Sequence, residues 1–409
     1  MAETASHGRS VRDVLGALTS GLIAGGSDND PTSVATLAVI GSTLVYDLNW
    51  LILLVLPMLL VIQIMSARVG VVTRKNLIEI VNERFGGRWT AVATFTLLVV
   101  NVFTLGADLE GGAAAAGLMF NLPWQWFVVP LAGAIGIVLV FGNYEQISRI
   151  LRYFVLVFAA YILAAFLARP DWSSVLYHTF VPTIRTDRAF VAAVLALLGT
   201  TLTSYVYVWE TIEEEEEHRP IGQLRLVELD AAVGIGIAVL LFWFITVATG
   251  ATLGVHHQPV ATAEDAARAL EPIAGPFAGF LFALGLLASA LLAVPILSAT
   301  SAYVMAATFR WRGSLNEPVG RGSRAFYAVL VGSLVIGVGL TVLGVEPIQL
   351  LFFAGIVGGI GTPLLLVFLL LIAGSQTIMG RYRVSGFIQA IGWLSAIVIG
   401  LASIVYLFT

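Results

Sequence analysis

The succession of apolar stretches along the chain is the feature that most constrains its fold. About eleven of them reach the roughly 17–25 residues that an α-helix needs to cross a bilayer. In lipid every backbone polar group must be paired internally, so uninterrupted spans of this kind are helical. The sequence therefore predicts an all-α, polytopic membrane protein with a single transmembrane domain over residues 1–409. The stretches cover approximately 12–45, 49–67, 89–119, 124–142, 150–168, 188–211, 229–253, 273–309, 322–344, 347–373 and 385–408.

Composition excludes several classes of protein. With 58% hydrophobic and 11% charged residues, the chain has too little polar surface for a soluble globule. The sequence has no cysteine, which removes disulfides, thiolate metal ligands and cysteine nucleophiles. It also lacks a phosphate-binding Gly-rich loop ending in Lys-Ser/Thr, so we do not expect it to hydrolyse ATP. We expect no cofactor, no nucleic-acid partner and no enzymatic activity, and we expect a monomer in the lipid bilayer.

Basic residues predict the orientation, because short loops rich in Lys and Arg stay in the cytoplasm. The predicted spans place all but four of them on the side of the amino terminus. The exceptions are Arg169, Arg185, Arg188 and Arg268. The sequence thus predicts a bacterial-type inner (plasma) membrane protein with a cytoplasmic amino terminus and an external carboxyl terminus. Residues 1–11 fit a cytosolic tail better than a signal peptide.

The first span is interrupted near its middle by the residues GGSDNDPTS at positions 25–33. A carboxylate at the bilayer centre costs at least about 2.5–3.5 kcal/mol on insertion scales. Irregular backbone survives at this depth only when it is buried in protein or lines a watery cavity. The segment therefore predicts an ion site at Asp30, with Asp28 and Thr32 in a second shell or vestibule.

A second interruption, GTTLTSY at positions 199–205, falls in the sixth span, five spans after the first. Paired interruptions indicate inverted repeats whose substrate lies where the two unwound helices meet. The repeats would cover about 12–168 and 188–373, with an extra helix at 385–408. Oxygen ligands of this kind suit a hard cation. We expect Asp30, Ser33, Thr200 and Thr203 to bind it, with Thr201, Tyr205 and Glu210 behind them or in the vestibule.

Plainer roles exist for the same residues. The threonines of the sixth span could bond backbone carbonyls of their own helix. Asp108 in the third span could pair with a hydroxyl of a neighbouring helix, and Tyr205 could be a packing or gating residue. The acidic run Glu213 to Glu217 could attract cations or be a solvated face, and His256-His257 fits an incidental loop pair better than a metal site.

Several motifs together resemble the natural resistance-associated macrophage protein (Nramp) family of divalent-metal transporters. The resemblance implies the leucine-transporter fold, with a 5+5 inverted repeat plus one helix and with helices 1 and 6 broken. It covers nearly the whole chain. The matching residues are Asp30-Pro31, the segment ARVGVVT at 67–73 with Leu77 and Glu79, Asp108-Leu109, the 199–205 segment and Met379-Gly380.

Departures from the family pattern bear on the cargo. Typical members have Asp-Pro-Gly-Asn at the first break and Met-Pro-His at the second, where this chain has Thr32-Ser33 and Thr203-Ser204-Tyr205. Loss of the methionine sulfur removes a preference for softer ions. The sequence thus resembles the Nramp-related magnesium transporter branch, and it predicts import of magnesium, with manganese also carried.

The same comparison with the family pattern predicts that proton coupling is weak or absent. Tyr205 replaces the family's histidine, and a tyrosine exchanges protons poorly at neutral pH. Asp108 and Glu110 remain as possible proton stations, although Glu110 is offset from the usual second carboxylate.

Three alternatives stay open at this point. One is an ordinary proton-coupled manganese or iron importer, and another is an amino-acid carrier, although Asp30 would repel its substrate's carboxylate. The third is an intramembrane aspartyl protease using Asp47 and Asp108. The predicted topology puts Asp47 at the outer edge and Asp108 near mid-membrane, which opposes that pairing.

Overall fold

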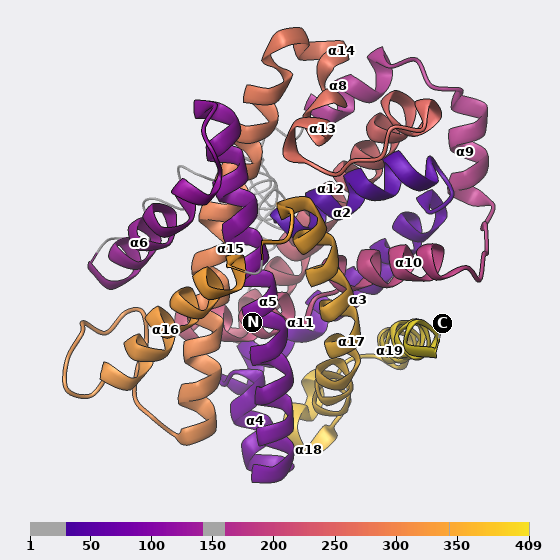
Figure 1. Cartoon of the computed structure of the whole chain (residues 1–409). Coiled ribbons are helices and arrows are strands. Elements are labelled where there is room, and N and C mark those ends of the chain that lie inside the picture. Colours follow the sequence, from indigo (N-terminus) through magenta and orange to yellow (C-terminus); the bar gives the residue numbers. More distant parts are fainter. Residues whose placement is uncertain (1–29, 142–159, 343, 409) are drawn as a thin grey trace, which may run out of the picture.

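Helices form all the regular structure in the computed structural model, which describes residues 30–141, 160–342 and 344–408 (Figure 1). Short helices α4 and α18 lie at one end of the bundle, and α13 and α14 lie at the opposite end. The helices along the predicted spans are α2 (Pro31–Leu44), α3 (Asn49–Thr73), α5 (Gly87–Phe120), α6 (Gln125–Phe141), α8 (Ala160–Leu167), α10 (Arg188–Thr201), α11 (Ser204–Glu217), α12 (Leu224–Thr252), α15 (Ala278–Phe309), α16 (Arg324–Thr341), α17 (Pro347–Ala373) and α19 (Gly386–Phe408). The connecting helices are α4 (Leu77–Arg84), α9 (Trp172–Phe180), α13 (Ala263–Arg268), α14 (Glu271–Ala274) and α18 (Gln376–Met379).

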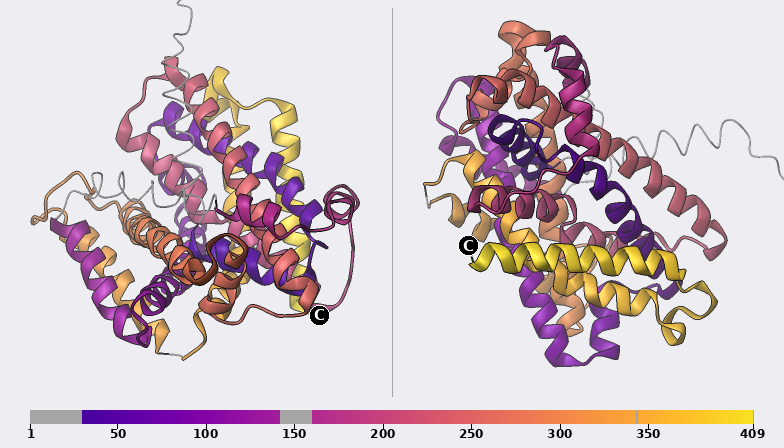
Figure 2. Two further views of the ribbon diagram at one scale, coloured as in Figure 1. Left: turned by 90° about the horizontal axis from the view of Figure 1, so that it is seen from above. Right: turned by 90° about the vertical axis from the view of Figure 1, so that its right-hand side faces the viewer.

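The predicted membrane spans are confirmed in the described ranges. Eight helical segments are long and apolar enough to cross a bilayer, and α2 and α6 are shorter apolar helices. Some predictions lie outside the described residues. They concern the first part of the first span, most of the span at 150–168, and Asp28. Figure 2 shows α19 along the outside of the bundle, which agrees with its largely exposed surface.

Local sequence sets the helix bounds near two of the spans. After the second span, α4 begins after the N-cap Asn76 and buries Leu77, Ile80 and Val81. The expected span at 273–309 is confirmed, since Glu271–Phe309 forms one candidate membrane span, although a turn interrupts its first helical residues. Gly275 has a φ of 49° and ends the short α14, and a tight turn then leads into α15.

Both predicted interruptions place helix ends inside the bundle. Pro31 opens α2 directly after Asp30, which suits a proline because the first helical position needs no amide hydrogen. In the sixth span α10 ends at Thr201 and α11 begins at Ser204, leaving Leu202 and Thr203 between them. The two helix breaks expected from the sequence therefore begin or end at the expected residues, as far as the described chain extends.

Close backbone contact fixes α10 against α17. A side chain at Gly199 would overlap the carbonyl oxygen of Gly355 and the backbone of Gly359. Thr36 of α2 lies beside Gly355 as well. Small residues allow membrane helices to approach closely, and here they bring α2, α10 and α17 together around the end of α10.

Candidate metal site

Two carboxylates bind the amino-terminal end of α2. Asp30 Oδ1 accepts a hydrogen bond from the backbone N–H of Ser33 at 2.7 Å. Asp108 Oδ1, from α5, accepts from the backbone N–H of Thr32 at 3.1 Å and from its hydroxyl at 2.6 Å. The first amides of a helix favour negative charge. The break in the first span therefore positions both acids at one helix end.

The second interruption meets the same helix end. Tyr205 at the start of α11 donates its hydroxyl hydrogen to Asp30 Oδ2 at 2.8 Å. Ser33 and Thr200 share a hydrogen bond of 2.9 Å between their hydroxyl oxygens. The broken ends of α2, α10 and α11 are thus joined by side chains that the sequence had assigned to the site or to its second shell.

A narrow cavity with about 150 Å³ of space between its atoms lies between these helix ends, and it is too narrow for a freely placed water molecule. The Thr203 hydroxyl is buried and has no hydrogen-bond partner among the described residues. A buried oxygen without a partner is costly unless something binds it. The residues lining the cavity are Asp30, Thr32, Thr104, Gly199, Thr200, Thr203, Ala354 and Gly355.

The charge of this site is not balanced by a basic side chain. Asp30 is 3% exposed and Asp108 is fully buried, and neither forms an ion pair with Lys, Arg or His in the described chain. Asp108 Oδ2 has no hydrogen-bond partner there either. Buried carboxylates are normally paired, protonated or bound to metal. The arrangement can therefore accept a cation or protons.

Some predicted site residues have other contacts. The Thr201 hydroxyl donates to the Leu197 carbonyl at 2.7 Å within α10, as expected for the plainer role of a threonine in a membrane helix. Thr201 is not among the residues that line the cavity. Glu210 accepts from the Gln63 side chain at 2.8 Å, which ties α11 to α3.

Glu110 lies further along α5 and is fully buried. Neither of its carboxylate oxygens has a hydrogen-bond partner within the described ranges, and it is not among the residues lining the cavity. Asp108 takes the plainer role of bonding a neighbouring helix hydroxyl, that of Thr32, while its second oxygen stays unpartnered.

Sequence reasoning missed three residues of the cavity. Thr104 lies one helical turn before Asp108 on α5, and this i, i+4 spacing could have revealed it. Ala354 and Gly355 of α17 carry no polar side chain, so nothing in their chemistry marks them. They line the cavity because α17 packs closely on α10.

The acidic run at the end of α11 is held by other polar groups. Glu214 pairs with Arg219 at 3.3 Å, and Glu215 accepts from Asn76 at 3.1 Å. Glu216 accepts from Tyr303 and Ser314, both at 3.0 Å. These contacts offset the unfavourable charge at a helix carboxyl end.

Helix α4 faces the acidic run. Burial raises the pKa of the Glu79 carboxyl, and the nearby Lys75 lowers it by a smaller amount. Glu79 and Glu215 also interact electrostatically, and two negative charges at short range repel each other.

The two aspartates of the protease alternative have separate partners. Asp47, between α2 and α3, lies 3.4 Å from Arg185 and 3.7 Å from His178. Asp108 instead bonds Thr32 in the interior. A dyad needs both carboxylates on one proton, and these contacts do not bring them together.

Interrupted helices that meet at a buried, oxygen-lined cavity define a membrane protein of the leucine-transporter fold. Solved structures support this assignment of the fold. A manganese transporter from Eremococcus coleocola, crystallised with an aromatic bis-isothiourea compound, superposes with a TM-score of 0.77 at 16% identity, covering 98% of this chain and 87% of that one. MhsT in complex with L-phenylalanine has a TM-score of 0.67 at 15% identity, covering 96% of this chain and 98% of its own.

The chain belongs to the natural resistance-associated macrophage protein-like family, whose model matches residues 21–409. A relative from Caldanaerobacter subterraneus, named divalent metal cation transporter MntH, is 26% identical over 381 residues, which is 90% of this chain and 86% of the relative. The membership confirms the resemblance found in the motifs. The family is one of transporters, so the expectation that the chain is not an enzyme is also confirmed.

Proposed function

We propose that this protein carries a divalent metal cation across the membrane by alternating access, with Asp30 as a ligand of every cargo ion. One observation carries the proposal. Asp30 lines an oxygen-rich cavity between the broken helices, Asp108 bonds the adjoining end of α2, and neither buried carboxylate has a basic partner among the described residues. The printed names of the MntH relative and of the manganese transporter support the same cargo class. Alternating access then consists of movements of α2, α10 and α11 about this cavity.

The preferred cargo in this proposal is magnesium, with manganese also carried. Among the described residues, the lining side chains that can donate electron pairs supply carboxylate and hydroxyl oxygen. Oxygen ligands suit hard ions, and magnesium usually retains several waters beside one or two carboxylates. Asp30, Thr200 and Thr203 would bind the ion or its waters once the cavity widens, and Ser33 would join them by releasing Thr200.

Weak proton coupling belongs to the same proposal. Tyr205 is hydrogen-bonded to Asp30 at the place where a histidine would exchange protons more readily. Asp108 is engaged by Thr32, and Glu110 lies outside the cavity lining. Transport is proposed to run inward, with the amino terminus in the cytoplasm.

A second candidate is a proton-coupled importer of manganese or iron. Asp108 and Glu110 favour it, because both have carboxylate oxygens without a hydrogen-bond partner among the described residues and could hold protons on α5. High-affinity transport of cadmium together with strong metal-driven acidification would support this candidate over the first.

Uptake of magnesium, manganese and cadmium into proteoliposomes tests the proposal. Asp30→Ala should abolish uptake of all three ions. Asp187→Ala is the matched control because Asp187 also caps a helix, α10, by accepting from the Phe190 N–H at 3.0 Å, but lies at the surface. Transport that survives Asp30→Ala, or an equal loss in both variants, would contradict the proposed role of Asp30.

A further inference from the structure

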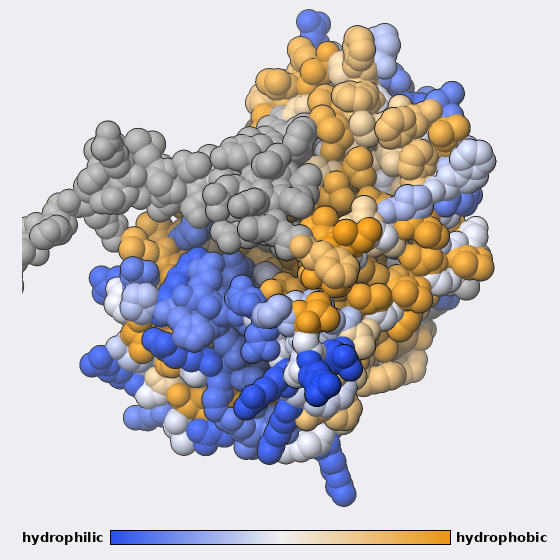
Figure 3. Space-filling view, turned by 90° about the vertical axis from the view of Figure 1, so that its left-hand side faces the viewer, coloured by the Kyte–Doolittle hydropathy of each residue, from blue (hydrophilic) through white to orange (hydrophobic). Residues whose placement is uncertain are grey.

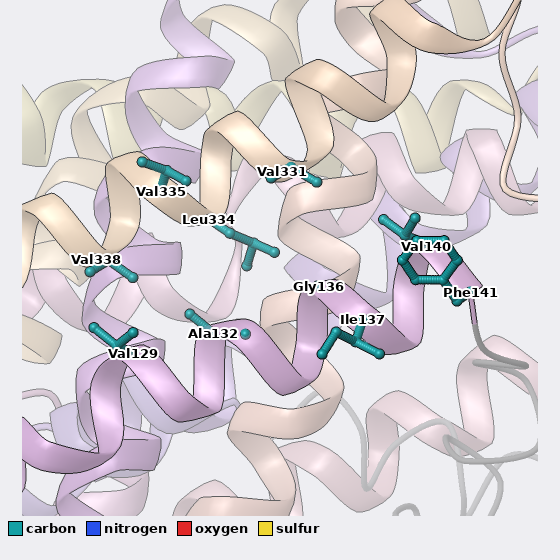
Figure 4. Close-up of a pocket in the computed structure, with 11 residues that line it drawn as sticks. Val129, Ala132, Gly136, Ile137, Val140, Phe141, Val331, Leu334, Val335 and Val338 are labelled. Carbon is teal, nitrogen blue, oxygen red and sulfur yellow. The ribbon is translucent and has the colours of Figure 1, made fainter. Parts of the chain in front are cut away.

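A groove without polar lining runs between α6 and α16, on the side of the bundle away from the metal site. It has a volume of about 500 Å³. Figure 4 shows the two helices side by side, with Val338 next to Val129 at one end and Val331 next to Val140 and Phe141 at the other. The helices are therefore antiparallel along the groove.

Small residues of α6 create the depth of this groove. A Cβ atom at Gly133 would meet nothing within 4 Å, and one at Gly136 would meet only Leu334 at 3.5 Å. The rim is strongly exposed, with 65% of Val335 and 82% of Phe141 accessible. An exposed apolar groove on membrane-spanning helices is suited to a hydrocarbon chain.

The stripe of α16 that lines the groove continues to a basic residue. Val331, Val335 and Val338 share a helix face with Ala328 and Arg324, at the i, i+4, i+7 spacing. Arg324 lies about 10 Å along the axis from Val331, at a rise of about 1.5 Å per residue. The groove thus leads toward a guanidinium group.

Arg324 belongs to a group of exposed arginines at the turn between α15 and α16. The others are Arg310, Arg312 and Arg321. None of the four forms an ion pair within the part of the chain that the structure describes. Figure 3, which views the side where α6 and α16 lie in Figure 1, shows a hydrophilic area bordering a hydrophobic one.

Aromatic residues mark the same turn as a membrane interface. Phe309 and Trp311 are stacked with their ring centroids 5.0 Å apart, and both are exposed. Exposed aromatic rings gather where headgroups meet the hydrocarbon. The arginines are therefore placed at headgroup level, while the groove lies at the level of the acyl chains.

We propose that this groove and Arg324 form a binding site for an anionic phospholipid, with one acyl chain between α6 and α16 and the phosphate at Arg324. Charge complementarity selects an anionic lipid over a zwitterionic one. Each arginine near an anionic headgroup contributes about fivefold to binding. The site is separate from the cavity at Asp30 and does not depend on which ion is transported.

Lipid retention measured by native mass spectrometry tests the headgroup contact. The full chain is purified in detergent with equal amounts of dioleoyl phosphatidylglycerol and dioleoyl phosphatidylcholine. The wild type should retain phosphatidylglycerol about fivefold in excess, Arg324→Gln should lose this excess, and Arg324→Lys should keep it. Arg88→Gln is the control, since Arg88 is an exposed arginine on α5 away from the groove. Equal retention of both lipids by the wild type, or an excess that survives Arg324→Gln, overturns the proposal.

A second pair of variants tests the groove itself. Gly136→Leu should fill it and lower retention of both lipids. Gly400→Leu on α19, where an added Cβ atom would meet nothing within 4 Å, should not. Leucine favours helix over glycine, so loss of lipid would not reflect weaker helices. Unchanged retention in Gly136→Leu contradicts the groove as the site. A dimer in the wild-type spectrum that Gly136→Leu abolishes would assign the groove to a second copy of the chain instead.

Discussion

The helix end at Asp30 and the helix end at Glu217 both concentrate acidic side chains, but the two regions satisfy them differently. At α2 the carboxylates of Asp30 and Asp108 receive hydrogen bonds from amides and hydroxyls and have no basic partner in the described chain. At the end of α11 the glutamates bond Arg219, Asn76 and Tyr303. A carboxylate held by basic or polar side chains serves packing, and one whose charge is left unbalanced can receive a cation.

We expect the largest effect from Asp30→Asn, which should weaken metal binding. The side chain keeps its shape and can still cap Ser33, but it loses the charge. We expect the affinity for magnesium and manganese to fall by at least about 100-fold, at the upper end of losses seen when groups that tune a metal site are changed. Calorimetric titration of purified protein measures this. Glu216→Gln is the control from the other region, and an equal loss there would erase the distinction between the two acidic ends.

The second-largest effect is expected from Thr203→Met, which should change the selectivity between metal ions. A thioether at this unpartnered position should shift preference from magnesium toward cadmium by about tenfold or more, because sulfur favours softer ions. Competition uptake in proteoliposomes measures the ratio. If magnesium-to-cadmium discrimination stays as in the wild type, Thr203 does not face the ion.

Two isosteric variants distinguish a hydroxyl that lines the cavity, that of Thr203, from one that bonds its own helix, that of Thr201. Thr203→Val should reduce magnesium affinity severalfold, by the loss of about 0.5–1.5 kcal/mol that one hydrogen bond contributes. Thr201→Val should leave affinity unchanged because the Thr201 hydroxyl bonds Leu197 in its own helix. Calorimetry on both proteins decides between them, and the reverse pattern would exchange their roles.

Asp108→Asn examines whether this acid serves the helix end or moves protons. Asparagine can still accept from Thr32, so the free energy of unfolding should fall by only about 1–2 kcal/mol. Metal-driven acidification should stay as low as in the wild type. Strong acidification in the wild type that disappears in the variant would make Asp108 a proton station.

The smallest effect on transport is expected at the acidic run. Glu216→Ala removes hydrogen bonds to Tyr303 and Ser314 and should lower the free energy of unfolding by about 1–3 kcal/mol, the cost of leaving partners unsatisfied. Metal affinity should remain unchanged. Thermal unfolding and calorimetry of the same preparation check both statements. A large loss of affinity would give the run a direct part in binding.

Much of the fold was predictable because lipid restricts the choices of the chain. The lengths of the apolar stretches predicted the membrane spans. The polar residues at 25–33 and 199–205 predicted where two of the helices break. Asp30, Thr200 and Thr203 were recognisable because an acid or hydroxyl beside a helix break has few other uses.

Other parts of the site depend on packing that a linear pattern does not contain. Ala354 and Gly355 line the cavity through the approach of α17 to α10, and neither has a reactive group. Thr201 looked equivalent to its neighbours, yet the direction of its side chain on α10 turns its hydroxyl toward Leu197. The turn between α14 and α15 was not predicted, because hydropathy does not detect a tight turn within an apolar run.

The glycine surface between α10 and α17 has a mechanical consequence. Gly199 faces Gly355 and Gly359 with hydrogen atoms alone, whereas the Leu195 side chain, one turn earlier on α10, packs directly against Gly359. At Gly199 the two backbones can shift relative to each other without displacing a side chain. Separation of α10 from α17 must instead move Leu195 off Gly359, so this leucine acts as a catch on the opening of the helix pair.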